Sequence, residues 1–295
     1  MKKLIERLLI FILGIPAIVA LVLFADFYNN LALNLIIVLL SGIGAVEFSS
    51  MLEKKQIKIS KVKSFFLGAV APLSITLHIS FNLPLWIVPV LIMAGIGWVL
   101  ITVIFTRLSD IESVIFNVIG NFSLIIYPGS FMYWLIKMKT WENNYAILLF
   151  LFIIFASDSM AWLFGTLFGA NNRGIVPVSP NKSIAGFIGG FLGPLIIAFL
   201  AVFIIFPDNI KFFPVSFSFY DTPVSAMFFA AFFLGFFPGL AAMLGDLAES
   251  AIKRSCDFKD SGNLMLGRGG ILDSLDSIAV AAPVFYLIYH YLFIL

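Results

Sequence analysis

Long apolar stretches dominate the chain and alternate with short polar segments. Crossing the hydrocarbon core of a bilayer takes about 20 apolar residues in a helix, in a range of about 17–25. Stretches of this length cover Leu8–Ala25, Leu31–Phe48, Ser64–Phe81, Leu85–Thr106, Ser113–Ile136, Tyr145–Gly169, Ile184–Phe206, Val224–Leu247 and Ile278–Leu295. The pattern predicts an all-α polytopic integral membrane protein with about nine transmembrane helices.

The first apolar stretch follows three basic residues, Lys2, Lys3 and Arg7, as the core of a secretory signal peptide would. Its apolar run is longer than such a core, and no small-x-small cleavage site follows it. We therefore expect this stretch to be retained as a helix.

Basic residues are concentrated in alternate linkers between the apolar stretches. Fifteen of the 18 Lys and Arg residues lie on one side of the predicted bundle, and the exceptions are Lys137, Lys139 and Lys211. Because basic loops stay in the cytoplasm, the N-terminus is expected to be cytoplasmic and the C-terminus to lie outside.

Composition narrows the class of protein further. Only 12% of the residues are charged, against about 25% in soluble domains, which excludes a water-soluble enzyme. The net charge of +2 is too small to indicate nucleic-acid binding. The single cysteine, Cys256, permits neither an internal disulfide nor a thiolate metal cage.

No linker is long enough to form a separate soluble domain. We expect residues 1–144 to supply about five N-terminal transmembrane helices. Residues 145–295 then supply about four more and form the catalytic region, with cytoplasmic loops 170–183 and 248–277.

Glycines four residues apart recur in three of the later apolar stretches. The pairs are Gly165/Gly169, Gly186/Gly190, Gly189/Gly193 and Gly235/Gly239. This spacing is typical of helices that pack closely in a membrane.

Ionisable residues inside the apolar stretches are costly, so each needs a partner or a function. Glu47, His78 and His290 lie near the ends of their stretches, where snorkelling to the interface or a satisfied hydrogen bond is a sufficient explanation. Asp158 lies midway along its stretch. We expect it to face the bundle interior or a watery cavity and to have a functional role.

The last cytoplasmic loop and its flanks carry the densest group of polar residues. If the preceding helix continues past Leu247, Asp246, Ser250 and Lys253 share one of its faces. Asp273 and Asp276 share a face at the start of the last helix. Two carboxylate clusters without His or Cys suit a hard cation such as Mg²⁺.

Positive charge and glycine-rich backbone accompany these carboxylates. The basic residues of the loop are Lys253, Arg254, Lys259 and Arg268. The Gly267–Gly270 segment precedes a helix N-terminus, where exposed backbone N–H groups can bind phosphate. Together these groups indicate a phosphoryl- or nucleotidyl-transfer site. In the earlier loop, Lys182 could bind another phosphate and Ser179 could donate a hydrogen bond.

These residues resemble the phosphatidate cytidylyltransferase (CDP-diacylglycerol synthase) family. Its signature reads roughly Ser-x-x-Lys-Arg, Lys-Asp, Pro-Gly-His-Gly-Gly and Leu-Asp-Arg-x-Asp. The matching residues are Ser250, Lys253, Arg254, Lys259, Asp260, Gly267, Gly269, Gly270, Leu272, Asp273 and Asp276, with Gly245, Asp246 and Glu249 upstream. Ser179-Pro-x-Lys182 and Asp158-Ser159 also resemble family patterns.

The chain departs from the signature at three positions. Leu266 and Arg268 stand where Pro and His are usual, and Ser274 stands where Arg is usual. Arg268 could replace the missing histidine by its charge. Serine cannot replace arginine as a bidentate phosphate ligand, so catalytic efficiency or nucleotide preference is expected to differ.

The resemblance implies condensation of CTP with phosphatidate to CDP-diacylglycerol and pyrophosphate, with Mg²⁺ and with room for a second cation. Asp246 and Asp273 would be metal ligands and, with Asp276 and Lys253, the catalytic residues. The substrate-binding residues would be Ser179, Lys182, Ser250, Arg254, Lys259, Asp260, Asn263, Arg268, Gly269, Gly270 and Asp158. The expected setting is the lipid bilayer of a bacterial inner membrane, with the site facing the cytoplasm and a homodimer as the assembly.

Two other functions fit parts of the pattern. A CTP-dependent polyprenol kinase would use a similar site at the membrane rim. An anion transporter could use Asp158 and the basic loops, although no pair of broken helices suggests an inverted repeat. CDP-alcohol phosphotransferases fit less well, because their Asp-Gly-x-x-Ala-Arg element is absent.

Overall fold

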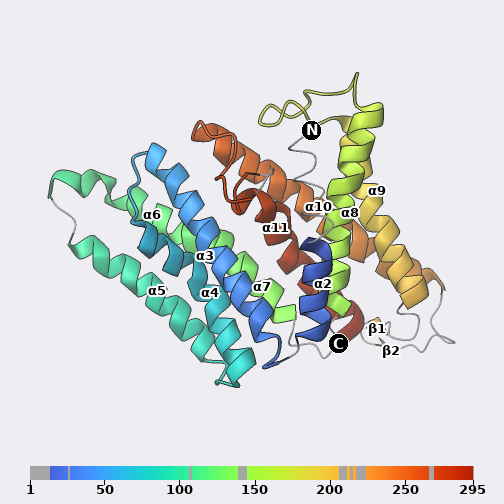
Figure 1. Ribbon diagram of the computed structural model, residues 1–295, viewed down its shortest axis with the longest axis horizontal. Coiled ribbons are helices and arrows are strands. Elements are labelled where there is room, and N and C mark those ends of the chain that lie inside the picture. Colours follow the sequence, from blue (N-terminus) through green and yellow to red (C-terminus); the bar gives the residue numbers. More distant parts are fainter. Residues whose placement is uncertain are drawn as a thin grey trace. The chain divides into compact units, whose positions relative to one another are not determined.

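The computed structural model is helical apart from one short hairpin, over the residues that it describes (Figure 1). These are residues 14–25, 27–105, 108–138, 145–205, 211–212, 215–216, 224–265 and 269–294. The hairpin pairs β1 (Lys211–Phe212) with β2 (Val215–Ser216) in antiparallel register.

The chain divides into two compact units. The first comprises Met1–Glu142 and Ile252–Leu275, and the second comprises Asn143–Ala251 and Asp276–Leu295. The boundaries after Ala251 and after Leu275 fall inside helices. The helices α10 (Val224–Ser255) and α11 (Leu272–Tyr289) therefore contribute residues to each unit.

The first unit is built mainly from the N-terminal helices, with the segment between α10 and α11 added to them. Its other helical segments are α2 (Ile15–Phe24), α3 (Leu31–Lys54), α4 (Lys61–Phe81), α5 (Ile87–Ile104), η2 (Leu108–Ser113), α6 (Val114–Leu124), η3 (Ile125–Ser130) and α7 (Phe131–Lys137).

The fifth apolar stretch is not the single continuous helix that the sequence predicts. Tyr127 has non-helical backbone angles, φ −123° and ψ 111°, and separates α6 from α7. The following residue, Pro128, explains the break, because proline has no N–H to donate and disfavours helical geometry in the residue before it.

Helices α3 and α4 approach each other closely through small residues. The Ser41 hydroxyl donates to the Gly68 carbonyl at 2.7 Å, and a Cβ added at Gly68 would collide with the Ala45 methyl group. The core beside this contact contains Phe48, Met51, Leu67, Val99, Leu124, Ile125, Cys256 and Leu272. Cys256 and Leu272, from the 252–275 segment, are therefore packed into the hydrophobic core of the N-terminal helices.

The second unit contains α8 (Tyr145–Phe168) and α9 (Ile184–Leu200), which lie side by side (Figure 1). Its remaining helical segments are η5 (Ala201–Ile205), most of α10, most of α11 and η6 (His290–Ile294).

Glycine allows these helices to pack backbone to backbone. A Cβ at Gly189 would collide with the Met160 carbonyl of α8, and one at Gly193 would collide with the Ala156 carbonyl. On α10, Gly239 packs against the ring of Pro194 in α9. The close packing that the glycine spacing predicts is confirmed.

Eight helical segments of the described residues are long and apolar enough to cross a membrane. They coincide with the second to ninth predicted stretches, and α10 and α11 extend beyond the predicted ends toward the polar loop. The first predicted stretch, Leu8–Ala25, lies partly outside the described residues, and its described part forms the ten-residue α2. The chain is thus a polytopic, helical integral membrane protein.

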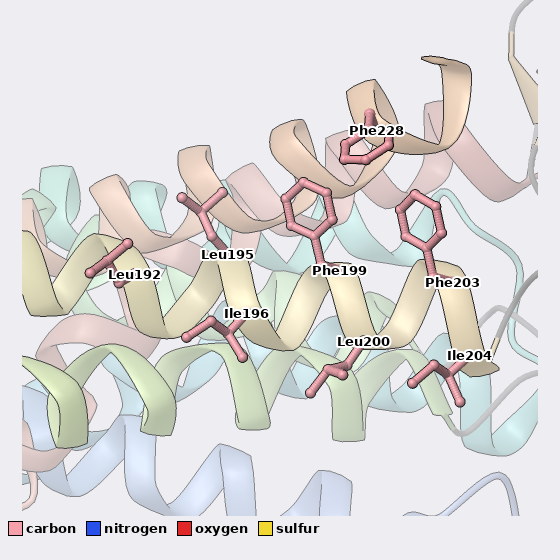
Figure 2. A pocket seen from close by; sticks show the side chains of 8 residues that line it. All are labelled: Leu192, Leu195, Ile196, Phe199, Leu200, Phe203, Ile204 and Phe228. Carbon is pink, nitrogen blue, oxygen red and sulfur yellow. The ribbon is translucent and has the colours of Figure 1, made fainter. Parts of the chain in front are cut away.

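An apolar groove of about 450 Å³ runs along α9 and η5 and is also lined by Phe228, near the start of α10 (Figure 2). Its walls are Leu192, Leu195, Ile196, Phe199, Leu200, Phe203, Ile204 and Phe228. None of the predicted polar site residues lines it. A groove of this composition on membrane-spanning helices is suited to contact with apolar lipid chains or another apolar helix.

Candidate active site

Helix α10 continues past Leu247 to Ser255, as the face-sharing prediction for its polar residues requires. Asp246, Ser250 and Lys253 all lie on this one helix. Lys253 belongs to the part of α10 that is assigned to the first unit, whereas Asp246 and Ser250 belong to the second unit.

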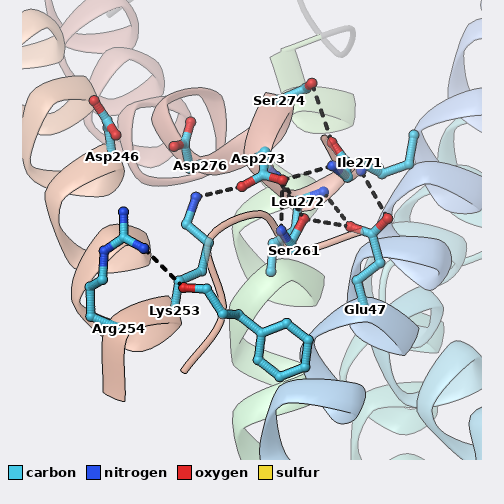
Figure 3. Close-up of polar contacts among 12 residues, drawn as sticks. Glu47, Asp246, Lys253, Arg254, Ser261, Ile271, Leu272, Asp273, Ser274 and Asp276 are labelled. Atoms are coloured by element: carbon cyan, nitrogen blue, oxygen red, sulfur yellow. Dashed lines mark hydrogen bonds and ion pairs between the residues drawn. The ribbon is translucent and has the colours of Figure 1, made fainter. Parts of the chain in front are cut away.

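In the first unit, Lys253 forms an ion pair with Asp273, the second residue of α11 (Figure 3). The Lys253 ammonium donates to Asp273 Oδ1. Both side chains are nearly buried, with exposed fractions of 11% for Lys253 and 7% for Asp273. The structure therefore brings together two predicted catalytic residues that are 20 positions apart in the chain.

The second oxygen of the Asp273 carboxylate, Oδ2, accepts hydrogen bonds from the preceding loop. Oδ2 accepts the backbone N–H groups of Ser261 and Gly270, each at 2.7 Å, and lies 2.9 Å from the Ser261 hydroxyl oxygen. Gly269 turns the chain toward this carboxylate with φ +107°, a conformation that glycine adopts without strain. The orientation of Asp273 is therefore fixed by backbone donors as well as by Lys253.

Glu47 of α3 supports the same segment (Figure 3). Its carboxylate accepts the N–H groups of Ile271 at 3.0 Å and Leu272 at 2.8 Å, and the Ser261 hydroxyl at 2.9 Å. These contacts satisfy backbone donors at the start of α11, where the helix dipole favours a negative charge. The hydrogen-bonded role expected for Glu47 is confirmed, but its place beside Asp273 was not predicted.

Gly269 and Gly270 are the described residues of the predicted phosphate-binding segment Gly267–Gly270. Gly269 donates its N–H to the Met265 carbonyl at 3.1 Å, and the Gly270 N–H is bonded to Asp273. These two donors already have acceptors inside the protein, so they hold the loop in place.

In the second unit, Lys182 forms an ion pair with Asp246. Lys182 lies in the loop between α8 and α9, just before Ser183, whose hydroxyl caps α9 by accepting the Gly186 N–H at 3.0 Å. The exposed fractions are 25% for Lys182 and 37% for Asp246. Ser179 contributes to the turn, where its carbonyl accepts the Lys182 N–H at 3.1 Å.

A group of acidic residues surrounds Asp276 in the second unit. Its carboxylate interacts electrostatically with those of Asp246, Glu249 and Asp158. Asp276 is 8% exposed and Glu249 is fully buried, whereas Asp158 is exposed on α8. Repulsion among like charges is offset by a neighbouring basic group, and Lys182, which pairs with Asp246, is such a group.

The other predicted substrate-binding residues lie at the loop surface or on α10. Ser250 is partly buried, and the exposed Arg254 donates to the Phe258 carbonyl at 3.2 Å. The remaining described residues of this set are exposed and comprise Lys259, Asp260 and Asn263. Arg268 lies outside the residues that the structure describes.

The donor set fits a hard cation by its chemistry. Asp246 and Asp273 offer carboxylate oxygens, and each already accepts a lysine ammonium. Within the described part of the chain, however, no three His, Cys, Asp or Glu side chains form a ready-made metal site. Asp246 and Asp273 belong to different units, so their joint role as metal ligands stays a prediction.

Comparison with known proteins identifies the family. A family model described as "Cytidylyltransferase family" matches residues 5–292. A phosphatidate cytidylyltransferase of Chlamydia pneumoniae is 30% identical over 270 residues, which cover 88% of this chain and 82% of that protein.

Two further relatives carry the same name. The phosphatidate cytidylyltransferase of Haemophilus influenzae is 39% identical over 152 residues, half of this chain and 46% of that protein. That of Bacillus subtilis is 33% identical over 175 residues, 58% of each chain. These two matches span about half the length of the relatives, whereas the family model covers nearly the whole chain. The chain belongs to the cytidylyltransferase family.

Proposed function

We propose that this protein is a phosphatidate cytidylyltransferase that makes CDP-diacylglycerol and pyrophosphate from CTP and phosphatidate. The relatives named for this activity support the proposal. The observation that carries it is the Lys253–Asp273 ion pair, formed by two residues of the family signature and framed by backbone donors. A buried ammonium beside a fixed carboxylate can bind a phosphate and a cation at adjacent points.

The reaction requires little acid–base catalysis by the protein. An oxygen of the phosphatidate monoester attacks the α-phosphorus of CTP, the bond from that phosphorus to the bridging oxygen breaks, and pyrophosphate leaves with the electron pair. The nucleophile is already ionised near neutral pH, so no residue has to remove a proton. The site must instead hold two anions together and offset the charge on the leaving group.

The basic residues are the proposed phosphate ligands: Lys182, Lys253, Arg254 and Lys259. Asp246 and Asp273 are the proposed ligands of Mg²⁺, with Asp276 nearby in sequence. Bound Mg²⁺ would offset the negative charge that develops on the transferring phosphates. Because each of the two aspartates accepts a lysine ammonium here, cation binding would release that lysine for contact with substrate.

The segregation of basic residues supports a cytoplasmic N-terminus, an outward C-terminus and a site at the cytoplasmic rim. Phosphatidate would keep its acyl chains in the bilayer of the bacterial inner membrane while its headgroup enters the site. The family resemblance further suggests a homodimer, which crosslinking in membranes can detect.

The decisive experiment supplies the purified protein, in liposomes that contain phosphatidate, with labelled CTP and Mg²⁺. We expect CDP-diacylglycerol and pyrophosphate in equal amounts, and no product when Mg²⁺ is chelated. In sealed inverted membrane vesicles, which expose the cytoplasmic face, CTP added outside should be consumed. Phosphorylation of an added polyprenol would instead favour the kinase, and anion flux without CTP turnover would favour the transporter.

A further inference from the structure

We propose that Glu47 is a positioning residue for Asp273: it holds Ser261 and the start of α11 so that Asp273 presents Oδ1 to its cationic partner. The proposal rests on the proposed nucleotidyl transfer, in which Asp273 is a metal ligand. All the contacts that support it lie within the first unit.

Glu47 reaches the signature segment from a distant part of the sequence. It is separated by 224 positions from Ile271 and by 225 from Leu272, whose N–H groups it accepts. The Glu47 residue is 7% exposed, and Ile271 and Leu272 are 7% and 0% exposed. These are the two residues directly before Asp273, so Glu47 determines where α11 begins its first turn.

Ser261 connects the two carboxylates. Its hydroxyl oxygen lies 2.9 Å from Glu47 Oε2 and 2.9 Å from Asp273 Oδ2, and it accepts the Asp273 N–H at 3.2 Å. A serine hydroxyl has one proton to donate, so it can serve only one of the carboxylates at a time. The side chain nevertheless keeps both carboxylates beside the same loop.

The consequence for Asp273 is a difference between its two oxygens. Oδ2 accepts backbone N–H groups at two sites, whereas Oδ1 accepts a side-chain donor, the Lys253 ammonium. A cation that competes with Lys253 would therefore meet Oδ1. The backbone donors at Oδ2 cannot move away from Asp273 unless the loop moves. Glu47 opposes such a movement through its hydrogen bonds to Ile271 and Leu272.

The packing around Glu47 favours a group that only accepts hydrogen bonds. A Cβ on Gly262 would collide with Glu47 Oε1, and a Cβ on Gly270 would collide with Glu47 Oε2 and Ser261 Oγ. Backbone thus encloses the carboxylate and directs N–H groups to both of its oxygens. A glutamine amide of the same size would point its own N–H hydrogens at one of these donors.

The test compares Glu47→Gln with Glu53→Gln, which makes the same change at an exposed position of the same helix. Ser261→Ala is a second variant, because it removes the hydroxyl that lies between Glu47 and Asp273 and leaves the sequence of α3 unchanged. Each protein is assayed for kcat and KM per folded molecule. Hydrogen–deuterium exchange of the peptide that contains residues 270–273 supplies a readout that needs no turnover.

We expect Glu47→Gln to lower kcat by up to about 10²-fold, as misplacement of a reacting group does, while KM for CTP changes much less. Exchange at Ile271 and Leu272 should rise, Ser261→Ala should show smaller changes in the same direction, and Glu53→Gln should match the unsubstituted protein. Normal kcat per folded molecule in Glu47→Gln, with or without loss of stability, would overturn the proposal, as would unchanged exchange.

The two proposals can fail separately. If the unsubstituted protein makes no CDP-diacylglycerol, the proposed function fails whatever the Glu47 variants do. If it does make the product and Glu47→Gln behaves like Glu53→Gln, only the positioning role fails.

Discussion

Two lysine–aspartate pairs in this protein differ in how they are held. Lys253 and Asp273 of the first unit have side chains that are 11% and 7% exposed, whereas Lys182 and Asp246 of the second unit are 25% and 37% exposed. Asp273 is also bonded to backbone N–H groups of Ser261 and Gly270. The first pair is therefore nearly buried, with its carboxylate also fixed by backbone donors, whereas the second pair is accessible to solvent.

Because of this difference in burial, we expect the two pairs to differ in their contribution to stability but not in their importance for activity. Removing one partner of a buried ion pair leaves an uncompensated charge and costs about 3–5 kcal/mol, whereas a solvent-accessible pair contributes about 0–1 kcal/mol. Both aspartates are proposed metal ligands, so loss of either should stop the reaction. Only loss of Asp273 should also weaken the fold.

The largest effect is expected for Asp273→Asn. Whichever way the amide is turned, its NH₂ faces either the backbone donors at Oδ2 or the Lys253 ammonium at Oδ1. We expect the protein to insert into membranes, to lose about 3 kcal/mol of unfolding free energy, and to lose CTP turnover by about 10²-fold or more.

The measurements are thermal unfolding in detergent and formation of CDP-lipid. A variant as stable as the unsubstituted protein would mean that the buried pair does not support the fold as described.

Asp246→Asn should reduce turnover about as strongly, because it removes the other proposed metal ligand. Its stability should stay within about 1 kcal/mol of the starting protein, since the Asp246 side chain is 37% exposed. The same two assays, run in parallel with Asp273→Asn, measure the contrast. Near-normal turnover in both variants would contradict the metal assignment, and a large loss of stability in Asp246→Asn would contradict the distinction between the pairs.

The smallest effect is expected for Ser183→Ala, which removes the cap of α9 next to Lys182. The Ser183 hydroxyl accepts the Gly186 N–H at 3.0 Å and is buried, and loss of such a cap costs about 1 kcal/mol. Turnover should fall less than in Asp246→Asn, because Lys182 keeps its charge. A suitable control is Ser255→Ala, whose exposed hydroxyl donates to the Ile252 carbonyl one turn earlier in its own helix at 2.8 Å and lies 3.5 Å from Cys256 Sγ. This variant should leave stability nearly unchanged.

Much of the fold was accessible from the sequence, because hydropathy is a local property. Eight of the nine predicted stretches coincide with apolar helices of the described residues, and the glycine pairs mark the close approach of α8 and α9. The break before Pro128 was missed, because the apolar run continues through it and hides the interruption. Proline there was the available signal.

The sequence also pointed to the family, through spaced polar residues in the last loop, and the match over residues 5–292 agrees. It could not assign partners to those residues. Spacing suggested only that the acids of α10 and α11 act beside basic residues. It did not indicate that Asp246 pairs with Lys182, which is 64 positions away in the sequence.

The sequence by itself determined the membrane class, the approximate spans and the set of candidate site residues, because each of these depends on residue type and local spacing. Tertiary structure alone decided that Glu47 meets Ser261 and the start of α11, that the glycine N–H groups are used internally, and that one lysine pair is buried while the other is accessible. These features depend on contacts between segments up to 225 positions apart, and no local pattern encodes which buried donor such a carboxylate will find.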